Sequence, residues 1–162
     1  MLITQWAVRW QVPPAAIADL AALLGAATQP DHGPTQPGSE AAVQNAVRME
    51  AARRGARVFR NNCGCLTDER GNMVRYGLCN ESTKINRIIK SSDLIGISPH
   101  GQFLAYEIKR PDWHYIGDQP CICKPHGRQC DRCHEKAQLA WLTFVNSMGG
   151  YAAFITSPEQ LP

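Results

Sequence analysis

A chain of 162 residues with 44% hydrophobic and 19% charged residues has the composition of an ordinary globular protein with a single core. Its net charge of +3 at pH 7 is compatible with a polyanionic partner but does not require one. Residues 1–14 lack the basic and apolar regions of a signal peptide, and no stretch approaches the roughly 20 apolar residues of a membrane span. We therefore expect a soluble, cytoplasmic protein, in which the seven cysteines are free thiols or metal ligands rather than disulfides.

Residues 1–39 read as a helical arm followed by a linker. Residues 13–24 begin with proline, precede Gly25 and carry an apolar stripe at helical spacing, which predicts a short helix. Residues 25–39 are rich in glycine, proline and small polar residues, as linkers are. We expect the arm to dock on its own domain or on a partner.

Residues 40–162 read as the main domain. Its elements are predicted as a helix at 40–54 capped by Ser39 and stopped by Gly55, strands at 57–60, 94–97 and 104–109, a helix at 135–148 and a last strand at 151–155. Residues 61–90 form a long excursion with a turn at Gly71. The last helix is expected to bury Trp141, Phe144, Val145 and Met148. This order of elements predicts an α/β fold with a small mixed sheet.

Two of the predicted strands carry the residues that are most informative about chemistry: Asp93, Glu107 and Lys109. Side chains alternate faces along a strand, so Glu107 and Lys109 point the same way. Residues 98–101 read as a turn, and a hairpin with this layout brings Asp93 beside Glu107. Two carboxylates and an amine can hold a divalent cation and orient a water against a phosphodiester. The alternative is an ordinary pair of charges on a solvated strand face.

Two polar residues on the predicted helices allow two interpretations each. Glu40 lies in the first helical turn, where the helix dipole favours any acid, but it could also join an acidic metal site. Gln138 lies near the buried face of the last helix, three residues before Trp141. It could be a solvated edge residue, or it could position Lys109, a water or a phosphate without adding charge.

The segment 118–134 stands apart because it contains four cysteines and almost no apolar residues. Cys121, Cys123, Cys130 and Cys133 have the spacing C-x-C-x6-C-x2-C, and four thiolates of this kind can close a tetrahedral zinc site. His126 or His134 could replace one cysteine. Zinc would supply the folding energy that the missing core cannot. The alternative is a loop with reduced thiols.

Several segments together resemble a known family. They are RNN (60–62), RYGL (75–78), IKSSDLIGI (89–97), EIKRPDWHY (107–115), AQ (137–138) and GGYAAFIT (149–156), and they stand in the order typical of a VRR-NUC domain. This virus-type replication-repair nuclease domain is a branch of the PD-(D/E)XK superfamily. The resemblance covers roughly residues 40–157 and is interrupted by the cysteine-rich segment, where the family has a short polar connection.

The resemblance implies a restriction-endonuclease-like core and a Mg- or Mn-dependent DNA endonuclease of phages or prophages, hence of a bacterial or phage-infected cell. Such enzymes can select branched DNA, such as four-way junctions, in replication, recombination or repair. The implied metal ligands are Asp93, Glu107, the main-chain oxygen of Ile108, and Glu40, while Lys109 and Gln138 complete the catalytic set. The implied DNA contacts are Arg60, Asn61, Ser92 and Arg110. A homodimer is expected, since cutting two strands needs two active sites.

Two other functions stay open at the level of sequence. One is a zinc-containing DNA-binding module that has lost catalysis, although Asp93, Glu107 and Lys109 are all chemically competent. The other is a restriction-type nuclease that reads a short sequence instead of a DNA branch.

Overall fold

The computed structural model describes residues 8–13, 15–16, 36–124 and 128–162. The chain divides into two compact units, residues 1–35 and 36–162. Most of the helix predicted at 13–24 and of the linker predicted at 25–39 lies outside the described residues. All the elements below belong to the second unit.

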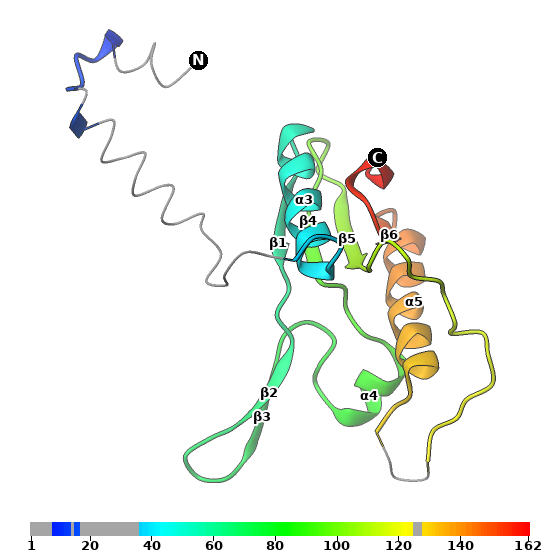
Figure 1. Cartoon of the computed structure of the whole chain (residues 1–162). Helices are drawn as coiled ribbons and strands as arrows, with labels where there is room; N and C mark the ends of the chain where they lie inside the picture. The colour runs from blue at the N-terminus through cyan, green and yellow to red at the C-terminus, as the bar shows by residue number, and fades with distance from the viewer. Residues whose placement is uncertain (1–7, 14, 17–35, 125–127) are drawn as a thin grey trace. The chain divides into compact units, whose positions relative to one another are not determined.

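The second unit is a mixed α/β fold (Figure 1). Its elements are α3 (Glu40–Arg53), β1 (Arg57–Arg60), β2 (Gly64–Thr67), β3 (Met73–Tyr76), α4 (Thr83–Ile88), β4 (Leu94–Ile97), β5 (Phe103–Ile108), α5 (Asp131–Ser147), β6 (Tyr151–Ile155) and the short 3-10 helix η1 (Pro158–Gln160). Four strands form a sheet in the order β1-β4-β5-β6, in which only β5 and β6 run parallel. The predicted small mixed sheet with helices is confirmed.

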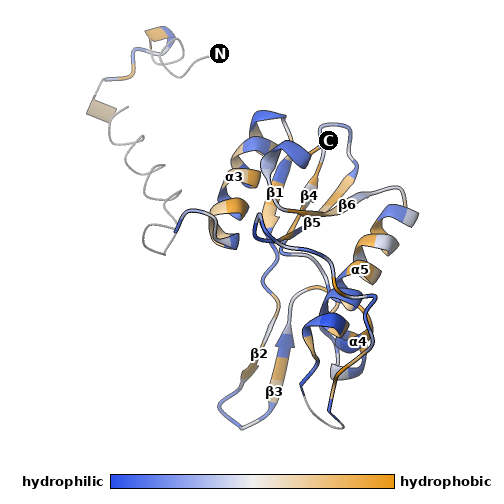
Figure 2. Cartoon of the chain, turned by 45° about the vertical axis from the view of Figure 1, so that its right-hand side comes forward, coloured by the Kyte–Doolittle hydropathy of each residue, from blue (hydrophilic) through white to orange (hydrophobic). Residues whose placement is uncertain are grey.

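The two long helices cover opposite faces of this sheet, and β5 separates the two cores. Alternate side chains of β5, Leu104, Tyr106 and Ile108, pack with Val43 and Val47 of α3. The intervening residues point the other way, toward α5. A second cluster on that side is formed by Ala105, Trp141, Leu142, Val145 and Ala152. Because both faces of β5 are covered, its side chains from Leu104 to Ile108 are all buried. Figure 2 shows β5 between the other strands of the sheet.

The ends of α3 follow the sequence prediction. The Ser39 hydroxyl accepts a hydrogen bond from the main-chain N–H of Ala42, as an N-cap does. Gly55 has φ +83°, the left-handed conformation that commonly ends a helix. The two signals place α3 so that its apolar stripe meets the sheet.

Helix α5 differs from its prediction in two ways. It begins at Asp131, four residues earlier than expected, so Cys130 is its N-cap and Cys133 lies in its first turn. The expected burial of Phe144 and Met148 is wrong, because they are 48% and 73% exposed. The buried stripe instead runs through the positions that face the sheet, namely Glu135, Ala137, Gln138, Trp141, Leu142 and Val145.

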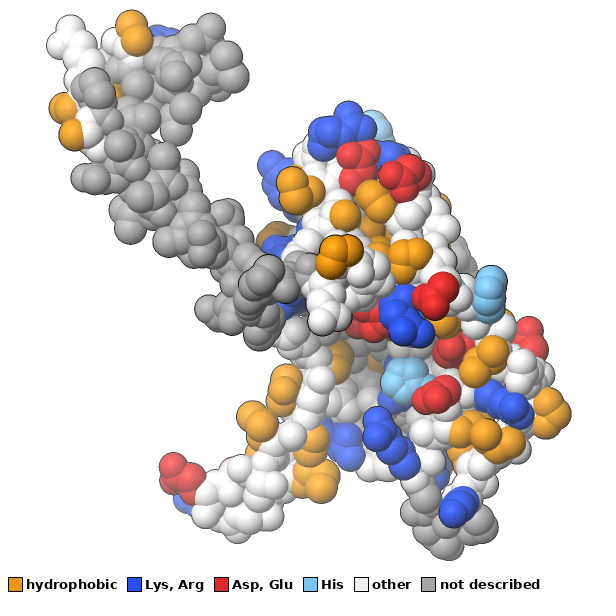
Figure 3. Space-filling view, viewed as in Figure 1, with side chains coloured by type: hydrophobic (Ala, Val, Ile, Leu, Met, Phe, Trp, Pro, Cys, Tyr) orange, Lys and Arg blue, Asp and Glu red, His pale blue; other side chains and the backbone are white. Residues whose placement is uncertain are grey.

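The excursion at 61–90 contains structure that the sequence pattern did not predict. β2 and β3 form a two-stranded hairpin of their own, closed by a turn in which Gly71 has φ +82°. Large apolar side chains of the hairpin lie exposed at the lower left of Figure 3. They belong to Leu66, Met73, Val74 and Tyr76. The short helix α4 then returns the chain to β4.

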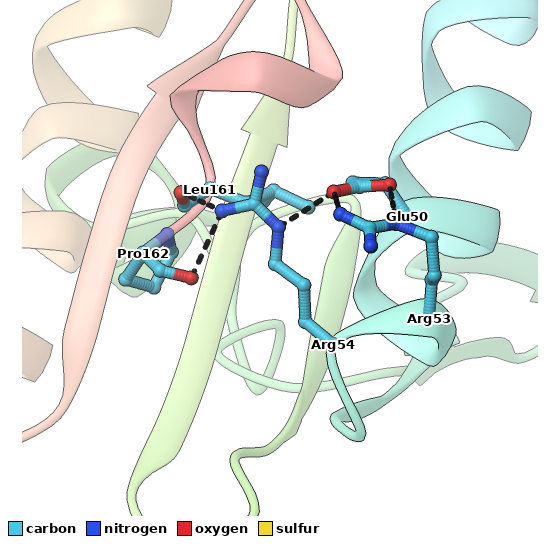
Figure 4. Close-up of polar contacts among 5 residues, drawn as sticks. All are labelled: Glu50, Arg53, Arg54, Leu161 and Pro162. Carbon is cyan, nitrogen blue, oxygen red and sulfur yellow. Dashed lines mark hydrogen bonds and ion pairs between the residues drawn. The ribbon is translucent and has the colours of Figure 1, made fainter.

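The end of the chain is tied to the end of α3 (Figure 4). The Arg54 guanidinium donates to the main-chain oxygens of Leu161 and Pro162, while its Nε donates to Glu50. Leu161 is buried in the core under α3. Within the described ranges, no helix has both the length and the apolar character needed to cross a membrane.

Candidate functional site

The register of β4 and β5 brings the predicted acidic pair together. Leu94 pairs with Tyr106, so Asp93, just before β4, lies opposite Glu107. Ala105 and Glu107 are alternate positions of β5 on the side of α5, and Lys109, just after the strand, continues this alternation. The N–H of Lys109 donates to the Ile155 oxygen at 2.9 Å, which prolongs the pairing with β6 beyond the strand. The register of the β4–β5 hairpin thus places Asp93 beside Glu107, as the sequence predicted.

Glu107, Lys109 and Gln138 form one buried polar cluster. The Lys109 Nζ lies 3.2 Å from Glu107 Oε1 and 3.0 Å from Gln138 Oε1. The amide Nε2 of Gln138 in turn donates to Glu107 Oε1. Each side chain therefore contacts both of the others. The arrangement fixes the ammonium in one place.

Asp93 is oriented by the main chain. Its Oδ2 accepts a hydrogen bond of 2.9 Å from the N–H of Ile108, which holds the Ile108 backbone against the carboxylate. Its main-chain oxygen accepts from the N–H of Asn61. One edge of the carboxylate is thereby fixed while Glu107 lies beside it.

The two carboxylates repel each other. Glu107 is only 3% exposed, and its burial together with the charge of Asp93 raises its pKa to about 8, although Lys109 opposes the shift. A buried acid of this kind is stabilised in its ionised form by a cation. The donor set of two adjacent carboxylates therefore suits a divalent metal ion.

An open pocket of about 370 Å³ lies in front of this cluster. Its lining is mainly polar and consists of Asn61, Cys63, Gly64, Cys65, Arg75, Leu78, Asn80, Asn86, Lys90, Ser91, Ser92, Asp93, Glu107, His134 and Gln138. The carboxylates of Asp93 and Glu107 thus share one pocket with amides and with the cations of Lys90 and Arg75. Such a pocket can hold a metal ion and an anionic group side by side.

His134 lines the pocket, which sequence reasoning missed. Its burial, and then the charges of Lys90 and Lys109, lower its pKa to about 4, so the imidazole is neutral at pH 7. His134 lies one helical turn before Gln138, and residues four apart share a helix face. The prediction that α5 begins at residue 135 concealed this signal, because His134 then belonged to the cysteine-rich segment.

The other predicted site residues divide between the pocket and the outside. Asn61 lies in the pocket, where its Nδ2 donates to the hydroxyl of Ser91 and to the main-chain oxygen of Ser92. Glu40, Arg60 and Arg110 are exposed and do not line it. Glu40 lies in the first turn of α3, and Arg110 pairs with Asp112 at 3.6 Å.

The interpretation of Ser92 as a DNA contact needs correction. Ser92 is 1% exposed. Its hydroxyl donates to the Leu94 oxygen and accepts from Trp141 Nε1. Because the hydroxyl is buried and makes both of these hydrogen bonds inside the protein, the side chain is not available to a phosphate.

The four cysteines of the insertion gather at the start of α5. The sulfurs of Cys121, Cys123, Cys130 and Cys133 all lie within 4.8 Å of one another. In a tetrahedral site with Zn–S bonds of about 2.3 Å, neighbouring sulfurs are about 3.8 Å apart. The cluster could therefore hold a metal ion such as zinc. His134 is not part of this group, and His126 lies outside the described residues.

Main-chain N–H groups point at the sulfurs of this cluster. The N–H of Cys123 donates to Cys121 Sγ at 3.3 Å, and the N–H of Cys130 donates to Cys123 Sγ at 3.2 Å. The N–H groups of Cys133 and Ile122 lower the pKa of Cys130 to about 6. The pKa of Cys133, in contrast, is raised to about 12 by the neighbouring thiols of Cys121 and Cys130. Ionisation is thus favoured at Cys130 and opposed at Cys133, and a bound cation would favour the thiolate form of both.

Comparison of the chain with protein-family models, with curated proteins and with solved structures found no match.

Proposed function

We propose that this chain is a metal-dependent DNA endonuclease of the VRR-NUC branch of the PD-(D/E)XK superfamily. The observation that carries the proposal is the buried Glu107, which lies beside Asp93 and is bonded by Lys109 and Gln138 at an open polar pocket. The small mixed sheet with helices on both faces agrees with the restriction-endonuclease-like core that the sequence resemblance implies.

Asp93 and Glu107 would hold one or two Mg²⁺ or Mn²⁺ ions, helped by the main-chain oxygen of Ile108. A divalent ion so bound would polarise the phosphodiester and lower the pKa of a bound water. The Lys109 ammonium has two of its hydrogens directed at Glu107 and Gln138, which leaves a third for the attacking water or the developing negative charge. Gln138 keeps the ammonium in position. Glu40 would act through water from the first turn of α3, and Glu40→Ala tests that role.

The DNA would lie across the pocket with its backbone against Asn61, Arg60, Lys90 and Arg110. Lys90 is half-buried in the pocket lining, and a cation there suits a phosphate next to the metal. Contacts of this kind bind without reading sequence, which fits an enzyme that selects branched or duplex DNA by shape. Two strands are cut by a homodimer in this proposal, and sedimentation of the purified chain tests the stoichiometry.

The cysteine cluster would hold a structural Zn²⁺. Four cysteines form a closed coordination shell without an open position for a substrate, which favours folding over catalysis. The ion would fasten the 118–130 segment to the start of α5, the helix that carries Gln138.

The proposal is tested by incubating the purified protein with labelled four-way junction, flap, single-stranded and duplex DNA, in Mg²⁺, Mn²⁺ or EDTA. Glu107→Ala should abolish cutting and leave DNA binding largely intact. Glu69→Ala is the matched control, because it removes an exposed acid between β2 and β3 and should cut normally.

Metal-dependent cutting that is lost only in Glu107→Ala supports the nuclease, and the product sites separate branch selection from sequence reading. DNA affinity without cutting on any substrate would instead favour a non-catalytic binding module.

A further inference from the structure

The Lys109 ammonium has an aromatic side as well as a polar one. Its Nζ lies 5.8 Å from the ring centres of both Trp113 and Phe154, within the range of a cation–π contact. The two rings lie 4.7 Å apart and are tilted by 37°. The ring of Tyr115 contacts both of them. The position of Lys109 therefore depends on this aromatic cluster as well as on Glu107 and Gln138.

Trp113 belongs to a segment that has no regular structure to hold it. Residues 109–117, between β5 and the cysteine-rich segment, form neither helix nor strand. Their side chains and main chain need other partners to keep the indole beside Lys109.

Glu135 supplies those partners from α5. Its Oε1 accepts from Trp113 Nε1 at 2.8 Å, and its Oε2 accepts from the N–H of Ile116 at 2.8 Å. Glu135 is 8% exposed, and both oxygens of this buried carboxylate bind the same segment. A buried carboxylate is costly unless its hydrogen bonds are made, and here each oxygen has a main-chain or indole donor.

Glu135 and Gln138 lie three positions apart on the same buried face of α5. Gln138 holds the ammonium directly, while Glu135 holds the indole that packs against it. We infer that Glu135 and Trp113 are positioning residues for Lys109, which α5 fixes from two sides. The catalytic importance of Glu135 and Trp113 rests on the proposed nuclease function, whereas their effect on the position of Lys109 does not.

The Lys109 amine can be observed directly in protein labelled with [¹⁵N]lysine. A hydrogen-bonded, shielded ammonium gives a side-chain NMR signal with slow hydrogen exchange, and the Lys109 signal is the one that Lys109→Met removes. Glu135→Gln and Trp113→Phe should speed this exchange by about tenfold or more, because the ammonium is then released to water. Trp113→Phe keeps an aromatic ring but loses the indole donor and part of the ring surface, so it serves if Glu135→Gln fails to fold.

Trp141→Phe is the matched control. It also removes a buried indole donor, at 3.2 Å from Ser92 Oγ, whereas the rings beside Lys109 among the described residues are those of Trp113 and Phe154. When each protein is measured the same number of degrees below its own Tm, the hydrogen-exchange rate of Lys109 in Trp141→Phe should match that in the parent. An unchanged signal in both test variants, or an equal change in Trp141→Phe, would overturn the inference.

Cleavage assays then separate this inference from the nuclease proposal. If the parent cuts DNA, both test variants should lower kcat by about 10- to 100-fold while KM for DNA stays within about twofold, since displaced catalytic groups reduce the rate of the chemical step. If the parent cuts no DNA but Lys109 exchange responds as expected, the positioning role stands and the nuclease proposal fails. If the parent cuts DNA and both variants keep its kcat and its Lys109 exchange rate, the positioning role is wrong and the nuclease proposal stands.

Discussion

At the scale of single residues, the raised pKa of Glu107 makes the stability of the protein depend on pH. Burial and Asp93 raise the pKa from 4.5 to about 8, so between these values the folded protein binds more protons than the unfolded chain. The free energy of unfolding must therefore fall as pH rises through this window. The slope is at most about 1.4 kcal/mol per pH unit for one group.

Glu107→Gln should remove this pH dependence, because the amide does not titrate. We expect the Tm of the parent, relative to that of Glu107→Gln, to fall between pH 5 and pH 8 in EDTA. Mg²⁺ or Mn²⁺ should restore the parent's Tm most strongly at the upper end, since the ion binds the ionised carboxylate. Parallel Tm curves for parent and variant would contradict the raised pKa.

At the scale of elements, α5 links the cysteine cluster to the candidate active site. Cys130 caps the helix without a side-chain cap bond, and Cys133 lies in its first turn. Glu135 and Gln138 follow within the next two turns. A metal ion on the cysteines would therefore hold the end of the helix that presents these side chains.

If the proposed function holds, Cys133→Ser should abolish metal binding by the cysteine cluster, loosen the first turns of α5 and reduce cutting by about tenfold or more. Metal content by elemental analysis, hydrogen exchange along α5 and cleavage rates check the three steps. Cys79→Ser is the control, because Cys79 lies outside the cluster and its variant should keep the metal. Full activity in a metal-free Cys133→Ser protein would show that α5 is held by its packing alone.

The β2–β3 hairpin is joined to the pocket by a close approach at Gly77. Its φ is +93°, and a Cβ there would lie 2.5 Å from Cys63 Sγ and 2.7 Å from the Asn62 oxygen. Gly77→Ala should lower the free energy of unfolding by about 2–4 kcal/mol, from left-handed strain and overlap together. Gly71→Ala, at φ +82° with open space around it, should lose only the strain, about 1 kcal/mol. Urea unfolding of the two variants measures the difference, and equal losses would mean that the backbone at 62–63 yields easily.

At the scale of the whole molecule, sequence patterns predicted the elements that are long or half-buried. The cap at Ser39 and the stop at Gly55 located α3, and the turn at 98–101 located the β4–β5 hairpin that pairs Asp93 with Glu107. Period two along β5 also placed Glu107 and Lys109 on one face. These signals are local, so one sequence is enough to read them.

Other features were hidden because local patterns do not determine them. The β2–β3 hairpin exposes apolar side chains such as Leu66 and Val74, so its strands lack the usual alternation of buried and exposed residues. The start of α5 has a cysteine at its N-cap and another in its first turn in place of an apolar stripe, which hid both the start of the helix and the position of His134. The fastening of Trp113 by Glu135 joins residues 22 positions apart, and no spacing rule predicts such a contact.

The closure of the chain end onto α3 gives a last prediction at this scale. Arg54 bonds the oxygens of Leu161 and Pro162, and Leu161 packs into the core under α3 (Figure 4). Arg54→Met should lower Tm by about 3–6 °C, because it frees the last residues and weakens that packing. Arg53→Met is the matched control: it loses only an exposed pair with Glu50, so its Tm should change by less than about 1 °C. A scanning calorimetry experiment compares the two variants. Equal shifts would mean that the Glu50 pair, rather than the closure over Leu161, accounts for the stabilisation.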